Sequence, residues 1–447
     1  MAIDDIKQLL MEKRYAELKE KIKYMQIQDI AEVIDELDTK NAIILFRLLP
    51  KEIAADVFSY LSSERQGEIS MMIDENELNE IMNDLFFDDK IDFLEEMPAN
   101  VVKRILRNTS EAERKLINQF LQYPEYSAGS LMTIEFVDLK KEMTVAQALD
   151  KIRRVGRDRE IVYTCYVTDA WRKLEGIVSL KELVLASPDT KVEDIMKKDV
   201  IYVDTYDDQE EVADVFKKYD FLAVPVVDQE KRLVGIITID DIVDVIEEET
   251  TEDIQRMAAI QPTEEEYLDA TTFMIARKRL LWLLILMISA TVSGYIIRKY
   301  EVALEAVVAL TAFIPMLMDT AGNAGSQASV TVIRSLVLGE LKFGDILKVI
   351  FKEVRVGILV GVALALVNFI RVCFIEGYDL GIAITISLTL VFTVIIAKII
   401  GGTLPMIAKR IGLDPAIMAS PLITTIADAI SLTIYFSLAV WILHINL

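Results

Sequence analysis

The sequence predicts a multidomain chain: an all-α superhelical N-terminal domain, a duplicated α/β pair, a long connecting helix and an α-helical transmembrane domain with five spans. Three observations support this fold class. Apolar positions recur about every 24 residues near the start, a second and longer duplication follows, and the last 171 residues contain apolar stretches long enough to cross a hydrocarbon layer of roughly 30 Å. We place the domains at residues 1–128, 129–190, 191–246, 247–276 and 277–447.

Charge divides the chain near residue 276. The first 276 residues carry 34 Lys and Arg against 61 Asp and Glu, a net charge of −27, whereas the remainder carries 14 against 10, a net charge of +4. An acidic surface of this size attracts cations and repels nucleic acid, so we expect divalent cations as partners and no nucleic acid. The first residues, MAIDDIKQLL, lack a basic segment followed by an apolar core, so we expect no cleavable secretion signal.

Rare residue types limit the metal and enzyme chemistry. Cys165 and Cys373 are the only cysteines and His444 is the only histidine. Neither a disulfide framework nor a cysteine zinc site is therefore expected, and a bound metal would meet oxygen ligands, which favour magnesium, calcium or manganese. Because no nucleophile with a neighbouring base and no phosphate-binding loop is visible, we do not expect an enzyme.

The first domain has the pattern of a helical repeat. Val33, Val57, Ile81 and Ile105 are each separated by 24 residues, and AEVIDEL recurs as ADVFSYL. A pair of short helices cannot bury its apolar face alone, so successive pairs are expected to stack into a superhelix. The same pattern suits an inert spacer, so it predicts architecture and no activity.

The second duplication predicts strand, helix, two strands joined by a tight turn, and helix in each copy. VTDAWRKLEGIVSLKEL in the first copy is similar to VVDQEKRLVGIITIDDI in the second. The two copies resemble a tandem pair of CBS modules, which commonly act as ligand sensors. In that family the pattern G-x-x-T-x-x-D, here Gly235, Thr238 and Asp241, often holds the ribose and phosphate of adenosine. The resemblance therefore implies ATP or another adenine nucleotide as a ligand of the second copy.

Acidic residues crowd the segment that leads to the membrane domain. Glu247, Glu248, Glu249, Glu252 and Asp253 lie within two turns of the expected connecting helix. Like charges three and four residues apart repel each other on a helix, so this helix needs counter-cations. A charge run is usually a solvated face, but this one joins the sensor to the membrane domain, where a cation-dependent change would have leverage.

Five apolar stretches are the candidate spans: about Leu280 to Ile297, Val302 to Met318, Val356 to Phe374, Leu380 to Ile400 and Ala416 to Ile445. Ten Lys and Arg flank them on one side and three on the other. The positive-inside rule then places the acidic N-terminal half in the cytoplasm and the C-terminus outside a cell membrane.

The second span continues into polar residues that an anchor would not need. Asp319, Asn323 and Gln327 fall on one helical face, and glycines nearby allow close backbone approach. Pro315 is expected to free a backbone carbonyl within this helix, as Pro421 is in the fifth span.

Asp428 is the only charged residue between Pro415 and Leu447, and it lies four residues from Thr424 on one side of the fifth span. A carboxylate in hydrocarbon costs several kcal/mol unless an ion, a partner or water meets it, so we interpret Asp428 as a cation site. The alternative is that Asp428 pairs with Lys398 and only joins helices. Against it, Lys398 is close to the cytoplasmic end of its span and could reach water.

In this order, these domains and the motifs TEDIQRMAAI, IPMLMDTAGNAGSQAS and GLDPAIMASPLITTIADAISL resemble the MgtE family of magnesium channels and transporters over essentially the whole chain. The resemblance implies a homodimer whose pore is lined by the second and fifth spans of both copies. It also implies that intracellular magnesium bridges acidic cytosolic faces and the connecting "plug" helix and closes the pore.

The resemblance supplies two sets of candidate metal-binding residues. The pore set is Asp428, Thr424, Thr425, Ala321, Gly322, Asn323 and Asp319. The regulatory set is Asp88, Asp92, Asp208, Glu210, Asp220, Asp241, Glu249, Glu252, Asp253 and Asp414. The chain departs from some relatives at Ser420, where they carry asparagine, and at Ala321, where they carry glycine.

Two other functions fit parts of the sequence. A secondary transporter that exchanges magnesium, cobalt or manganese for protons or sodium would use the same intramembrane acid, and a membrane-anchored CBS receptor would use the spans only as anchors. The polar residues at membrane depth argue against the receptor. Nothing in the sequence separates a channel from a coupled carrier or ranks magnesium above calcium, manganese and cobalt.

Overall fold

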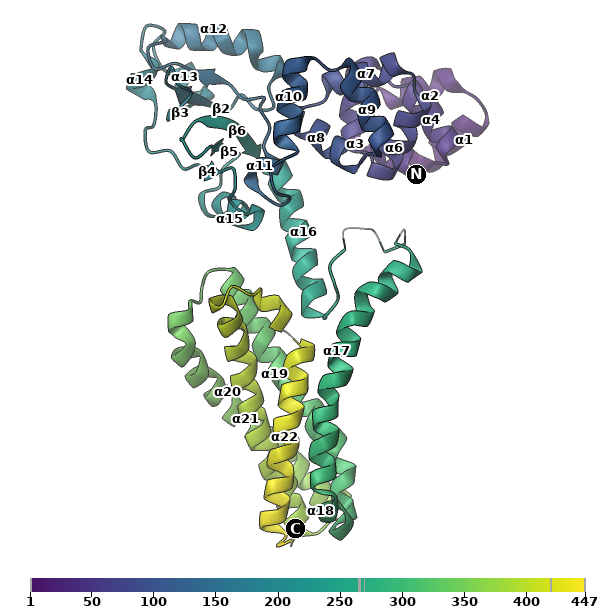
Figure 1. Ribbon diagram of the computed structural model, residues 1–447, viewed down its shortest axis with the longest axis vertical. Helices are drawn as coiled ribbons and strands as arrows, with labels where there is room; N and C mark the ends of the chain where they lie inside the picture. The colour runs from purple at the N-terminus through teal and green to yellow at the C-terminus, as the bar shows by residue number, and fades with distance from the viewer. Residues whose placement is uncertain (1, 264–266, 269, 419, 446–447) are drawn as a thin grey trace. The chain divides into compact units, whose positions relative to one another are not determined.

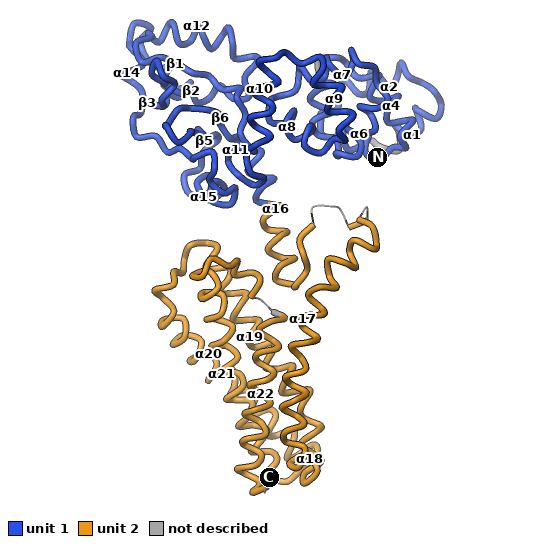
Figure 2. Tube along the Cα trace, in the orientation of Figure 1, with its two compact units in different colours: residues 1–246 blue, residues 247–447 orange. Residues whose placement is uncertain are grey.

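The computed structural model describes residues 2–263, 267–268, 270–418 and 420–445 (Figure 1). The chain forms two compact units, unit 1 at residues 1–246 and unit 2 at residues 247–447 (Figure 2). The predicted connecting segment, residues 247–276, therefore belongs to unit 2, and its residues 264–266 and 269 lie outside the described residues.

Unit 1 begins with ten short helices. Their bounds are α1 Ala2–Met11, α2 Tyr15–Ile22, α3 Ile27–Asp35, α4 Thr39–Arg47, α5 Lys51–Ser59, α6 Ser63–Met72, α7 Glu75–Asp84, α8 Phe87–Glu96, α9 Ala99–Asn108 and α10 Glu111–Phe120. In one row α3 packs on α5, α5 on α7 and α7 on α9, and in a second row α4 packs on α6 and α6 on α8. Helices in one row begin 24 residues apart, so the predicted repeat is confirmed.

The repeat positions form the core between the two rows. Val33, Val57, Ile81 and Ile105 are all buried, as the spacing predicts. Aromatic rings join neighbouring repeats, because Phe58 meets the ring of Phe93 edge to face at 5.2 Å between centroids. Since each repeat buries its apolar face only against the next one, the domain is stabilised mainly by contacts between neighbours.

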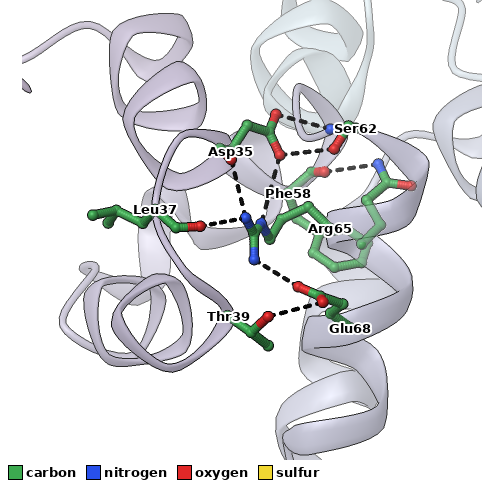
Figure 3. Close-up of polar contacts among 8 residues, drawn as sticks. Asp35, Leu37, Thr39, Phe58, Ser62, Arg65 and Glu68 are labelled. Carbon is green, nitrogen blue, oxygen red and sulfur yellow. Dashed lines mark hydrogen bonds and ion pairs between the residues drawn. The ribbon is translucent and has the colours of Figure 1, made fainter. Parts of the chain in front are cut away.

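Arg65 of α6 ties one repeat to the preceding one (Figure 3). Its guanidinium donates hydrogen bonds to the backbone oxygens of Asp35, at 3.0 Å, and Leu37, at 2.6 Å, and pairs with the carboxylate of Glu68 at 2.6 Å. Asp35 in turn accepts from the backbone N–H and the hydroxyl of Ser62. The arginine thus satisfies carbonyls at the end of α3 that would otherwise lack partners.

Replacing Arg65 with alanine is expected to destabilise unit 1 by about 2–4 kcal/mol, because two carbonyls and a carboxylate lose their donor in a site where the arginine is only 12% exposed. Urea unfolding of the variant followed by circular dichroism measures this loss. Lys51→Ala is the matched control, since Lys51 forms an exposed ion pair with Glu80 and its loss should leave the free energy of unfolding nearly unchanged. Equal losses of unfolding free energy in the two variants would contradict the stabilising role of Arg65 between repeats.

The rest of unit 1 is a pair of similar α/β modules. After α11 Ala128–Leu131, the first contains β1 Asp138–Leu139, α12 Val145–Val155, β2 Thr164–Thr168, β3 Leu174–Ser179 and α13 Leu180–Leu185; after α14 Val192–Ile195, the second contains β4 Val203–Asp204, α15 Gln209–Tyr219, β5 Ala223–Val227, β6 Leu233–Thr238 and α16 Ile239–Met257. In each module the first strand is parallel to the second, and the second is antiparallel to the third. The predicted duplication is confirmed.

Unit 2 consists of the end of α16, five long helices and the short helix α18 among the described residues. They are α17 Thr272–Lys299, α18 Glu301–Ala306, α19 Ile314–Val337, α20 Ile346–Ile370, α21 Leu380–Arg410 and α22 Ser420–Ile442. Short 3-10 turns precede α19, α20 and α22, and a π-helical turn, Arg371–Ile375, follows α20. Helix α19 packs against both α21 and α22, and α20 packs against α21.

Four helical segments of the described residues are long and apolar enough to span a membrane. They are Thr272–Lys299, Phe343–Ile375, Leu380–Arg410 and Pro415–Ile442. Helix α19 is not among them, because its aspartate, asparagine, glutamine and arginine lower its mean hydropathy. The count of five spans from the sequence is therefore not reproduced by length and hydropathy alone.

The bounds predicted for the second span are wrong. Residues 302–318 are not one helix, since α18 ends at Ala306, a 3-10 turn covers Val308–Phe313, and α19 begins at Ile314. Pro315 lies in the first turn of α19, where the missing N–H costs nothing, so it frees no carbonyl inside a helix. Pro421 likewise lies in the first turn of α22. The polar residues that were expected to follow the second span therefore form the middle of helix α19.

The connecting helix also differs from its predicted range. Helix α16 begins at Ile239 and ends at Met257, and the described residues between Ala258 and Ala270 are not helical. Ala259, with a positive φ of 54°, closes the helix, and the side-chain amide of Gln255 pairs with the backbone of Thr263. The five glutamates and aspartates singled out in the sequence all lie on the helical part.

Candidate functional site

The helices that carry the candidate pore residues approach each other closely at glycines. A side chain on Gly322 would clash with the methyl group of Thr424 at 2.7 Å, and one on Gly325 would clash with Ile423 at the same distance. Gly325 and Gly401 meet backbone to backbone, so α21 approaches α19 on a neighbouring side. The close approach expected from the glycines therefore fixes α22 against α19, with Thr424 in the contact.

The polar residues of α19 lie on a free face of the protomer. Asp319, Asn323 and Gln327 are all exposed, and Arg334 follows on the same side near the cytoplasmic end predicted for this helix. The opposite side of α19 is apolar and buried against α21 and α22. A polar stripe of this length on a membrane helix is not stable against lipid tails.

Asp428 lies two turns into α22 and is half-buried. Its Oδ1 atom is shielded from solvent without a hydrogen-bond partner, and its carboxylate is within electrostatic range of Asp319. A buried oxygen without a donor is costly unless a ligand or water supplies one. The arrangement brings two carboxylates from two helices to one region and leaves an acceptor free for a cation.

Lys398 does not neutralise this carboxylate. Among the described residues no ion pair joins Asp428 to Lys398, and Lys398 acts electrostatically on the carboxylate of Glu353 of α20. The expectation that Lys398 reaches water is also wrong, because it is only 5% exposed. Lys398 therefore places its positive charge between α20 and α21. The alternative that Asp428 only joins helices by pairing with Lys398 is left without its ion pair.

The remaining predicted pore residues fall into two groups. Thr424 and Thr425 lie one turn before Asp428, and the hydroxyl of Thr425 donates to the backbone oxygen of Pro421, which leaves its lone pairs available. Ala321, by contrast, is 0% exposed and packs with Val394, Ala397 and Ala427, on the side of α19 away from Asn323. Neither Ala321 nor Gly322 lies on the polar stripe, so either contributes at most a backbone oxygen.

A cluster of carboxylates lies inside unit 1, where α8 meets the two modules. It comprises Asp88, Asp89, Asp92, Glu160 and Asp241, which we call the unit 1 acidic cluster. Burial, followed by the charge of Asp241 and other neighbouring carboxylates, raises the pKa of Asp89 to about 7 and that of Glu160 to about 8. Burial, followed by Asp89, raises the pKa of Asp92 to about 7, and burial raises that of Asp241 to about 6. Burial also raises the pKa of Asp88 well above its usual range.

These shifts give unit 1 an expected pH dependence. The folded-state pKa values lie above the unfolded values of about 4, so folding takes up protons and stability falls as pH rises from about 4 to 8. We expect residues 1–246, which have their own core, to unfold at lower urea at pH 8 than at pH 6 without metal. Magnesium should recover more stability at pH 8, when the cluster is ionised.

Asp89→Asn combined with Glu160→Gln is the test variant for this pH dependence. It should flatten the pH dependence and weaken the stabilisation by magnesium, whereas Asp150→Asn with Glu193→Gln, two carboxylates outside the cluster, should change neither. A pH profile that is unchanged by the cluster variant would contradict the assignment.

The structure brings together some predicted regulatory residues and separates others. Asp88, Asp92 and Asp241 share the unit 1 acidic cluster. Asp208 caps the start of α15 and binds the backbone N–H of Glu210, whereas Asp220 closes the other end of the same helix in a left-handed conformation. Eleven helical residues, roughly 16 Å, separate the two ends, so these three residues cannot form one site within the protomer.

The predicted nucleotide residues are adjacent at the end of β6. The hydroxyl of Thr238 donates to Asp241 at 2.7 Å, and Thr238 is buried. Gly235 is required by protein packing, because a side chain there would meet Met132 and the backbone oxygen of Thr133 at 2.8 Å. Asp241 therefore belongs both to the nucleotide pattern and to the unit 1 acidic cluster.

The predicted connector acids meet the turn before α22 within unit 2. Burial, followed by the charge of Asp414, raises the pKa of Asp253 to about 6, and burial also raises the pKa of Glu252. Glu249 acts on both. Glu249, Glu252, Asp253 and Asp414, which we call the connector acids, therefore lie within electrostatic range of one another.

Sequence reasoning missed three residues of these clusters. Asp89 and Glu160 join the unit 1 acidic cluster, and Arg256 contacts Glu252 and Asp414. The pair of Glu252 and Arg256, four residues apart on a helix, was a visible signal, but Glu160 gave none. In the part of the chain that is described, no three His, Cys, Asp or Glu side chains converge tightly enough to hold a metal ion by themselves.

Comparison with known families matches three parts of the chain. Residues 314–438 match a family described as divalent cation transporter, residues 25–126 match the MgtE intracellular N domain, and residues 192–248 match the CBS domain.

Relatives and solved structures cover more of the chain. The magnesium transporter MgtE of Thermus thermophilus is 37% identical over 94% of both chains, and that of Bacillus subtilis is 36% identical over 94% of this chain and 95% of its own length. A crystal structure of the cytosolic domain of the Mg²⁺ channel MgtE in complex with ATP has 38% identity and a TM-score of 0.52, covering 54% of this chain and 99% of that one. The soluble part of a magnesium transporter gives the same TM-score at 30% identity, covering 55% and 97%.

Proposed function

Because this chain belongs to the MgtE family, we propose that it carries magnesium ions across the cell membrane as a channel or transporter. The single observation that supports this most is Asp428, whose shielded Oδ1 has no partner at membrane depth beside a second carboxylate, Asp319. Magnesium releases water reluctantly and usually takes one or two carboxylates, keeping several waters. Asp428 binds the hydrated ion, and Thr424 and Thr425 contact its water shell.

The functional unit in this proposal is a homodimer. One protomer leaves Asp319, Asn323 and Gln327 of α19 exposed, and these residues need water rather than lipid. A second copy placed against this face encloses an aqueous path between two α19 and two α22 helices. The pair of Asp428 carboxylates then supplies two negative charges for one divalent ion, weakly enough for its release.

The membrane orientation follows from the basic residues. Helix α19, second in chain order, is taken as a span in addition to the four apolar helices, and the partner copy shields it from lipid. The N-terminal half then lies in the cytoplasm and the C-terminus outside, in agreement with the positive-inside rule.

Intracellular magnesium closes the pore in this proposal. The unit 1 acidic cluster and the connector acids hold carboxylates whose pKa values are raised by burial and mutual repulsion, and divalent cations relieve both. Binding of magnesium therefore favours the compact arrangement of each cluster, and the transported ion regulates its own entry. ATP binds the second module near Gly235, Thr238 and Asp241, where it competes with the cluster for Asp241.

Transport by the purified protein in liposomes tests the function. We expect saturable uptake of magnesium and slower uptake of calcium, with manganese and cobalt measured in parallel, and empty liposomes as the control. Unitary currents separate a channel from a coupled carrier. No magnesium uptake by folded protein, under any internal magnesium concentration, would refute the proposal.

A further inference from the structure

One arginine links the end of α16 to the turn before α22. The guanidinium of Arg256 contacts Glu252, one helical turn earlier, and the Oδ2 atom of Asp414, which is 158 residues later in the chain. The Oδ1 atom of Asp414 accepts the backbone N–H of Ala416 at 2.8 Å. The aspartate is therefore fixed at both oxygens, and Arg256 is joined through it to the segment that leads into the helix of Asp428.

The last turn of α16 is held in place from a second direction. Backbone atoms of Thr263 bind the side chain of Gln255, and Lys278 of α17 donates to the backbone oxygen of Pro262 at 2.6 Å. Arg256 is thus presented to Asp414 by an anchored turn, and it is about one-third exposed. This geometry favours a lasting contact over a transient surface pair.

The charge balance explains why a cation is needed here. The four connector acids repel one another, since Asp414 and Glu249 each act unfavourably on Glu252 and Asp253. Arg256 is the one base that contacts two of them within the described residues. The planar guanidinium bridges two carboxylates in the way a small divalent cation would.

We propose that Arg256 is a built-in substitute for the divalent cation, which holds α16 against the α21–α22 turn when magnesium is low and competes with magnesium for Glu252 and Asp414 when it rises. The proposal rests on the proposed regulation of the connector acids by magnesium. Without the arginine, the contact becomes dependent on metal. Magnesium also binds more tightly, because one positive charge and one competitor are gone.

Distances between spin labels on Thr251→Cys in α16 and Leu413→Cys in the turn test this in the full-length protein, in nanodiscs, with Cys165 and Cys373 replaced by serine. Labelled protomers are diluted with unlabelled ones so that distances arise within one chain. In EDTA we expect a short distance between the labels in the parent, which retains Arg256, and a longer, broader distance distribution in the Arg256→Gln variant. Added magnesium should restore the short distance in that variant, whereas the parent should keep its short distance throughout the titration. The magnesium concentration that closes the pore, measured by flux, should be on the order of tenfold lower in the variant than in the parent.

Two further variants make the test specific. Arg256→Lys keeps the positive charge but lacks the planar guanidinium that can bind two carboxylates, so its distance distribution in EDTA should lie between those of the parent and Arg256→Gln. Arg279→Gln, which removes the same charge from α17, should match the parent. The proposal is overturned if Arg256→Gln and the parent have the same distance in EDTA, short or long. Recovery of the short distance in magnesium shows that the variant is folded. A failure of magnesium to shorten the distance in Arg256→Gln would count against the proposed regulation, while the comparison in EDTA still decides the role of Arg256.

Discussion

Replacing Asp428 with asparagine is expected to reduce magnesium flux in liposomes by at least about 100-fold. The substitution keeps the shape of the side chain but removes the charge, and in a dimer it removes both charges that compensate one divalent ion. Asp428 is half-buried with a shielded, unpartnered oxygen, so the variant should fold as well as the parent or better.

Asp379→Asn is the matched control for this loss. Asp379 is also an aspartate of the membrane domain, but it caps α21 through the backbone N–H of Gly381, a role that asparagine fills equally well. Flux should therefore be unchanged in that variant. Parental flux through a stably folded Asp428→Asn protein would remove Asp428 from the ion path.

Neutralising Glu249, Glu252 and Asp253 together is expected to keep the pore conducting at magnesium concentrations that close the parent. The midpoint of closure should rise by on the order of tenfold or more, because the three charges that attract magnesium to the connector are absent. Flux recorded against internal magnesium measures the shift. Glu247→Gln with Glu248→Gln, on the same helix, serves as the control.

This shift and that expected for Arg256→Gln have opposite signs. Removing the acids weakens magnesium binding, whereas removing the arginine strengthens it and leaves the metal-free contact open. Closure at an unchanged magnesium concentration in the acid-neutralised protein would separate the connector from gating.

The architecture was predictable from the sequence where a pattern extends over many residues. The 24-residue repeat, the duplicated module and four spans depend on many apolar positions, so single exceptions did not mislead. The second span failed because hydropathy favoured 302–318, whereas the helix begins at Ile314, next to Pro315 in its first turn. Mean hydropathy cannot identify a membrane helix whose free face is polar.

The candidate site was predictable only where its residues share one helix. Two positions, about 200° around a helix, separate Ala321 from Asp319, so its burial on the other side could have been predicted. The acids of α8 and α16 were identified by motif, but the contribution of Glu160 and the pairing of Arg256 with Asp414 depend on chain segments that are distant in sequence. Such contacts follow from tertiary packing, which local pattern does not specify.

Water accessibility of residue 428 tests the central claim most directly. In full-length protein with Cys165 and Cys373 replaced by serine, we predict that Asp428→Cys reacts with a charged, membrane-impermeant thiol reagent. We also predict that the introduced thiols of the two copies can be cross-linked to each other, and that Leu359→Cys on the exposed apolar face of α20 stays unreactive. A thiol at position 428 that neither reacts from water nor cross-links, in a protein that still transports magnesium, would contradict an ion path centred on this residue.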